Sequence, residues 1–171
     1  MEIINIELIG LFHQDLSNGE LPFGKHLLPN NLESLTLNSK STLLENDLPS
    51  SITQLYCNFD GQSSFEINSI PPSVKTLRLT TNTLQPLPIG LIPNSVVKLT
   101  LPDNYNHPLP VGVLPESLTE LTLGSHYDQP LNSNTIPQSV TLISLHNKSY
   151  QHPIPESLSK KLKIIKDRNY Y

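Results

Sequence analysis

A proline that follows leucine or isoleucine returns at a nearly constant interval along this chain. The intervals are 20 residues, then four times 22, then 18, between Pro29, Pro49, Pro71, Pro93, Pro115, Pro137 and Pro155. Each of the first six prolines opens the same frame, proline-x-x-aliphatic-x-x-aliphatic-x-leucine, with Cys57 in the last place of the second copy. A fixed period of this size is the signature of stacked repeats, in which a unit can bury its apolar side only against its neighbours.

One repeat contains a single short strand. In Leu99-Thr100-Leu101 and its counterparts, the two apolar residues point one way and the residue between them points the other. Because every copy runs in the same direction, neighbouring strands must pair in parallel. Prolines such as Pro108 and Pro110 favour extended or turn backbone in the return segments. The sequence therefore predicts a repeat solenoid in which short parallel β-strands form one sheet, with Pro-rich turns, extended return segments and little helix.

We expect one solenoid domain over residues 1–171. Residues 1–28 are interpreted as a degenerate N-terminal repeat and cap with an insertion at Phe23–Leu28, residues 29–154 as six repeats, and residues 155–171 as a C-terminal cap. In that cap, Leu162 and Ile164 are expected to be the inward strand residues, one residue later after Pro155 than the repeat frame places them. Lysines beside them would discourage another chain from adding to the open edge.

Charge and composition exclude several classes of protein. The net charge is −4, although the chain from Ser159 onward has five cations against one carboxylate, so the body is acidic. An acidic body argues against nucleic acid as the main partner. The first twelve residues contain no basic residue, unlike a signal peptide, and no apolar run is long enough to span a bilayer. A single cysteine gives no disulfide framework. We expect a monomeric, intracellular (cytoplasmic) protein that does not bind membranes.

The repeated unit resembles leucine-rich repeats, in particular the short kind that contains proline. The asparagine that follows the strand in that family is matched at Asn82 and Asn104. The resemblance implies that these side-chain amides bond to neighbouring backbone in the turns.

A closer resemblance is to the FNIP repeat, which occurs in social amoebae and giant viruses. Its pattern is visible in Tyr105-Asn-His-Pro-Leu109, followed by Gly112, by Leu114-Pro115 and by Ser117. The segments that begin at Tyr127 and Tyr150 have the same form. The resemblance implies a repeat used for protein–protein contact, sometimes joined to an F-box. No helical F-box segment is evident before the repeats, so a link to ubiquitination is not expected.

Residues with chemical reactivity form no catalytic pattern. Cys57 occupies a core position of its repeat and is interpreted as a buried apolar thiol. The carboxylates are dispersed, and no glycine loop suited to phosphate is present. The six histidines are not paired at metal-ligand spacing; they are His13, His26, His107, His126, His146 and His152. We expect a non-catalytic protein without a metal or cofactor.

The best candidate site lies on the outward positions of the strands. Tyr56 and Arg78 occupy the same outward position in neighbouring repeats, and Tyr and Arg are enriched at interface hot spots. Outward positions on either side extend this patch to Gln54, Asn58, Thr76 and Lys98. The column that contains Asn58 continues to Pro102 and Gly124. The sequence thus predicts a protein-binding patch, whose protein partner it does not identify.

A glycan-binding or surface-binding solenoid is the alternative function. Flat threonine arrays can match a repeating surface, and Thr36, Thr100 and Thr122 share one outward column. Tyr56 and Arg78 interrupt that column, which disfavours ice or crystal binding. A polysaccharide hydrolase or lyase would need a carboxylate cluster that the sequence lacks.

Overall fold

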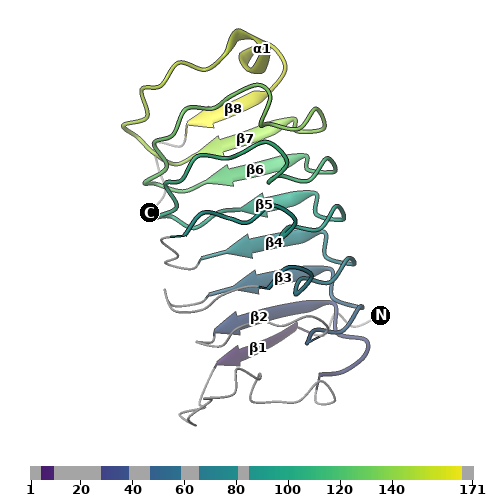
Figure 1. The fold of residues 1–171 in the computed structure, drawn as a ribbon. Helices are drawn as coiled ribbons and strands as arrows, with labels where there is room; N and C mark the ends of the chain where they lie inside the picture. Colours follow the sequence, from purple (N-terminus) through teal and green to yellow (C-terminus); the bar gives the residue numbers. More distant parts are fainter. Residues whose placement is uncertain (1–4, 10–27, 39–46, 59–65, 81–84, 167–171) are drawn as a thin grey trace.

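The computed structural model describes residues 5–9, 28–38, 47–58, 66–80 and 85–166. These residues form eight strands and one short helix, which are β1 (Asn5–Ile9), β2 (Ser34–Asn38), β3 (Gln54–Cys57), β4 (Thr76–Leu79), β5 (Lys98–Thr100), β6 (Glu120–Leu123), β7 (Leu142–Leu145), α1 (Glu156–Ser159) and β8 (Lys163–Lys166). The strands stack in chain order into one parallel sheet, with all arrows pointing the same way (Figure 1). The predicted parallel-strand solenoid with little helix is confirmed.

The strand register places equivalent residues of successive repeats side by side. Leu77 pairs with Leu99, and Leu99 pairs with Leu121, so the inward positions form continuous columns. These side chains are at most 1% exposed. Cys57 is 0% exposed and pairs with Leu79, which confirms its predicted core position.

The repeated proline begins a turn that leads into each strand. The carbonyl of Pro93 accepts a hydrogen bond from the Val96 amide at 3.1 Å, which turns the chain and places Val96 in the core. At the start of each strand from β3 to β7, two consecutive amides donate to one carbonyl of the preceding coil. The amides of Thr119 and Glu120 both donate to the Val97 carbonyl, at 2.8 and 3.0 Å. This arrangement fixes each coil against the previous one before the strand begins.

A ladder of serine hydroxyls also connects the coils. Two residues after the repeated proline, serine donates to a backbone carbonyl one coil earlier at 2.6–2.7 Å, from Ser51 to Leu32, Ser73 to Ile52, Ser117 to Val96 and Ser139 to Leu118. The ladder is interrupted at Ser95, whose buried hydroxyl has no partner.

The bond to neighbouring backbone that the resemblance implies for Asn104 is not seen. Its buried Oδ1 has no hydrogen-bond partner among the described residues. Asn82 lies outside the described residues, as does nearly all of the predicted insertion at Phe23–Leu28, of which only Leu28 is described.

The last strand has a different register from the one expected. The register aligns Ile143 with Ile164, so Ile164 rather than Leu162 takes the first inward position of the last strand. The cause is α1, which adds one turn after Pro155 and delays the strand. Leu162 precedes β8 and is 7% exposed, and its amide donates to the Leu158 carbonyl at 2.8 Å.

The stacking of coils makes a prediction about buried leucines. Leu99 and Leu162 are 1% and 7% exposed, but Leu99 lies between β4 and β6 whereas Leu162 lies in the last coil described. Leu99→Ala should lower the free energy of unfolding by about 2–5 kcal/mol, as other buried leucine truncations do. Leu162→Ala should cost less, because the described residues give Leu162 a neighbouring coil on one side only. Urea denaturation measures both changes, and equal losses would contradict the stacking model.

Candidate functional site

The patch predicted on the strand face is assembled by the sheet register. Tyr56 pairs with Arg78, Gln54 pairs with Thr76, and Thr76 pairs with Lys98. Gln54, Tyr56 and Thr76 are half-buried, whereas Asn58, Arg78 and Lys98 are exposed. The register thus gathers all six residues on β3, β4, β5 and the first residue after β3; whether a partner binds there remains a prediction.

Hydrogen bonds fix the Tyr56 side of this patch. The Tyr56 hydroxyl donates to Gln54 Oε1 at 2.9 Å, which orients the amide group of Gln54. The Thr80 hydroxyl, in the next coil, donates to Asn58 Oδ1. These bonds hold the polar side chains around Tyr56 in defined positions and reduce the entropy that a partner must overcome on binding.

The cations of the patch differ in their partners. Lys98 Nζ lies 2.9 Å from Glu120 Oε1, and both side chains are largely exposed, so this ion pair contributes little to stability. Arg78 has no ion pair or hydrogen bond within the described part of the chain. The Arg78 guanidinium therefore presents its donors to solvent beside Tyr56.

The column that contains Asn58 is not outward along its whole length, contrary to expectation. Pro102 and Gly124 are buried. A Cβ at Gly124 would overlap the backbone of Pro102 and Asp103, so the two turns pack too closely there for any side chain. The polar surface is consequently continuous at Asn58 and Thr80 and ends at Pro102.

The reactive groups of the described residues are buried or dispersed. Burial raises the pKa of the Cys57 thiol, which keeps it protonated, and the thiolate is the nucleophilic form. Within the described ranges, no group of three His, Cys, Asp or Glu side chains could hold a metal ion. No helix in the same ranges is long and apolar enough to cross a membrane.

Three tyrosines fill the core of the return segments. Tyr105, Tyr127 and Tyr150 are at most 3% exposed, and the rings of Tyr105 and Tyr127 lie parallel with centroids 6.5 Å apart. The Tyr150 hydroxyl accepts from the Leu131 amide at 3.3 Å and donates to the Gln129 carbonyl at 3.1 Å. The Tyr127 hydroxyl is buried without a partner. Burial, with a contribution from Tyr150 and Tyr105, raises the pKa of Tyr127.

Sequence reasoning missed a second surface, on the turns before the repeated proline. The turns Glu66–Ser69, Pro88–Leu91 and Pro110–Val113 are each closed by a hydrogen bond from the fourth amide to the first carbonyl. Their third residues, Asn68, Gly90 and Gly112, have φ of 70°, 87° and 84°, as type II turns require.

The second residue of each turn is apolar and exposed. Ile67, Ile89 and Val111 are 53%, 58% and 61% exposed. A Cβ on Gly90 would lie 3.9 Å from Ile67 Cγ2, and one on Gly112 would lie 4.0 Å from Ile89 Cγ2, so consecutive turns are in contact. We call these three side chains the turn stripe. Their 22-residue spacing before Asn or Gly was visible in the sequence, which indicates only a recurrent turn.

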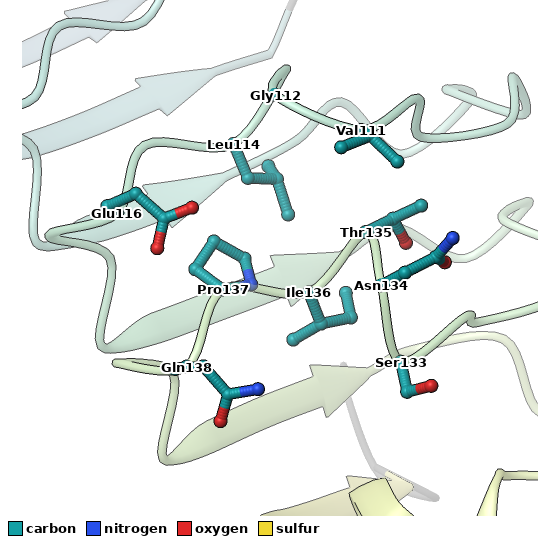
Figure 2. A pocket seen from close by; sticks show the side chains of 10 residues that line it. All are labelled: Val111, Gly112, Leu114, Glu116, Ser133, Asn134, Thr135, Ile136, Pro137 and Gln138. Carbon is teal, nitrogen blue, oxygen red and sulfur yellow. The ribbon is translucent and has the colours of Figure 1, made fainter.

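A shallow pocket of about 150 Å³ adjoins the turn stripe at Val111 (Figure 2). It lies between two neighbouring coils, and Leu114, Ile136 and Pro137 are among its lining residues. In the next coil Ser133 replaces the apolar residue of the stripe, and the Thr135 amide bonds to the Asn132 carbonyl. The apolar row therefore ends at the pocket.

Comparisons with known proteins agree with this architecture. The model of the FNIP Repeat family matches residues 41–82, 59–104, 82–121 and 105–148 in overlapping windows. The crystal structure of CroV588, described as a novel circular LRR protein structure, is similar over 81% of this chain, with a TM-score of 0.62 and 27% identity. The chain spans 24% of the length of that protein. A comparison with curated proteins found no match.

The buried tyrosines give a matched pair of variants. Tyr150→Phe leaves the Leu131 amide and the Gln129 carbonyl without their buried partner, so it should lower the free energy of unfolding by about 1–3 kcal/mol. Tyr127→Phe removes a hydroxyl that has no partner and should be neutral or stabilising. Urea denaturation of both variants checks this; an equal cost for Tyr127→Phe would show that its hydroxyl is bonded.

Proposed function

Because this chain belongs to the FNIP repeat family, whose solenoids are typical of interaction modules, we propose that it is a non-catalytic module that binds a protein partner through the exposed face of its sheet. FNIP and LRR repeat folds are generally scaffolds without enzymatic activity. The proposed contact patch consists of Tyr56, Arg78, Gln54, Asn58, Thr76 and Lys98.

The observation that carries this proposal is the pair formed by Tyr56 and Arg78. The two residues are direct neighbours in the register, and Arg78 is exposed without a partner in the described ranges. An arginine guanidinium has five donors in a rigid fork that binds carboxylates in a bidentate manner. A half-buried tyrosine beside it offers apolar area at low entropic cost.

Charge supports a partner with an acidic contact surface. The patch contains two cations, Arg78 and Lys98, and Glu120 forms an ion pair with Lys98 alone. The chain as a whole has a net charge of −4. A cationic patch on an acidic body orients an incoming partner and accelerates association at low ionic strength.

Glycan binding is the second candidate function. Thr100 and Thr122 are direct neighbours on β5 and β6, and both are half-buried, so their hydroxyls lie along the same face as the patch. A glycan array discriminates between the two candidates, since a glycan-binding solenoid should retain specific glycans on this array.

The test is affinity capture from native extract with identification by mass spectrometry, followed by a measured affinity for each captured protein. The Tyr56→Ala/Arg78→Glu variant should weaken binding of the true partner at least tenfold, because hot-spot residues contribute more than about 2 kcal/mol each. The control is Lys160→Glu, which makes the same charge change as Arg78→Glu in the exposed pair with Glu156 at the far end of the stack.

Both variants must keep the circular dichroism spectrum and the melting behaviour of the wild type. A partner that binds the wild type and the double variant equally would contradict the proposed patch. Specific retention of a glycan without any captured protein would favour the second candidate.

A further inference from the structure

We propose that the turn stripe is a second docking site, and that it binds an amphipathic helix with basic flanks on a partner protein. The stripe comprises Ile67, Ile89 and Val111, whose exposure lies between 53% and 61%. Single exposed aliphatic residues are normal on protein surfaces, but these three form a contiguous row over three coils. The proposal is independent of the strand face, because the stripe lies on the turns before the repeated proline.

The spacing of the stripe fits one face of a helix. Neighbouring coils are about 4.8 Å apart, as strands in a sheet are. Side chains at positions i, i+4 and i+7 of a helix advance by about 6.0 and 4.5 Å along its axis. A helix that lies along the stack axis would therefore place one apolar side chain on each coil, in the way that amphipathic helices bind apolar surfaces.

The pocket beside Val111 extends this match by one coil. Val111 and Leu114 line it from one coil, and Ile136 and Pro137 line it from the next (Figure 2). Because Ser133 stands where the stripe would continue, the chain itself leaves this coil without an exposed aliphatic residue. The pocket is also lined by Glu116, Ser133, Asn134, Thr135 and Gln138, so a basic side chain at the end of a bound helix would enter it and fix the register of the helix along the stripe.

The carboxylates at the two ends of the turn stripe indicate which residues should flank the partner helix. Glu66 immediately precedes Ile67 at one end of the stripe, and Glu116 lines the pocket at the other end. Both residues are exposed, and neither has an ion-pair partner within the described ranges. Carboxylates at both ends favour lysine or arginine on the partner and repel the headgroups of anionic lipids.

The probe is a fluorescein-labelled alanine-based peptide of roughly 14 residues, which spans about four helical turns. It has leucine at i, i+4 and i+7 and lysine at both ends; control peptides have a scrambled order or glutamate in place of lysine. Fluorescence anisotropy should show binding of the lysine peptide to the wild type. Ile89→Ser/Val111→Ser should weaken this binding at least tenfold, and Glu66→Gln/Glu116→Gln should weaken it and reduce its dependence on salt.

One control variant separates this site from the strand face. Tyr56→Ala/Arg78→Glu should bind the peptide as the wild type does, because both residues lie on the strands β3 and β4 and not on the turns. Failure of the proposed strand-face function would leave this result unchanged.

Several results would overturn the proposal. These are absence of binding, equal binding of the scrambled or glutamate peptide, and equal binding by Ile89→Ser/Val111→Ser. Sedimentation that shows wild-type self-association, lost in Ile89→Ser/Val111→Ser, would replace the helix by a second copy of this chain. Binding of phosphatidylcholine vesicles through the same residues would replace it by a lipid surface.

Discussion

The backbone hydrogen bonds between coils are the interaction on which the rest of this structure depends. A strand of three to five residues is too short to be stable alone, and each strand from β2 to β7 obtains its partners from the coils before and after it. Carbonyls such as that of Val97 each accept hydrogen bonds from two amides of the next coil. The serine ladder adds further hydrogen bonds between neighbouring coils. Stability therefore accumulates along the stack, and each unit depends on its neighbours.

This dependence divides the residues of a repeat into two groups. The leucine, proline and serine positions must keep their place, because a shift by one residue would turn the apolar side chains to solvent. The positions between them are free to vary, and they form two surfaces with different chemistry. The strand face presents Arg78 and Lys98 beside Tyr56, whereas the turn surface presents aliphatic side chains between Glu66 and Glu116.

The sequence predicted those features that the period enforces. The parallel sheet, the inward columns and the juxtaposition of Tyr56 with Arg78 all follow from counting in steps of about 22 residues. The prediction from the sequence was wrong where the local backbone departs from the 22-residue period. The extra turn of α1 delayed the last strand by three residues relative to the frame, and the close approach of Gly124 to Pro102 ended the outward column.

Part of the surface was missed because residue type alone does not determine burial. Ile67, Ile89 and Val111 are aliphatic, yet a type II turn points its second side chain away from the core. The residue types at the third turn position, Asn68, Gly90 and Gly112, tolerate a positive φ and could have indicated such turns from the sequence. The pocket beside Val111 depends on side-chain positions in two coils, which no single repeat predicts.

Deletion of one whole repeat tests most directly that the stack is built from equivalent coils. Removal of residues 93–114 joins Ile92 to Pro115 and keeps the frame, whereas removal of residues 93–103 breaks it. We expect the first variant to unfold cooperatively in urea with a smaller m-value than the wild type, since less surface is exposed on unfolding, and the second to be unfolded. Unfolding of both variants, or equal stability of both, would contradict the account.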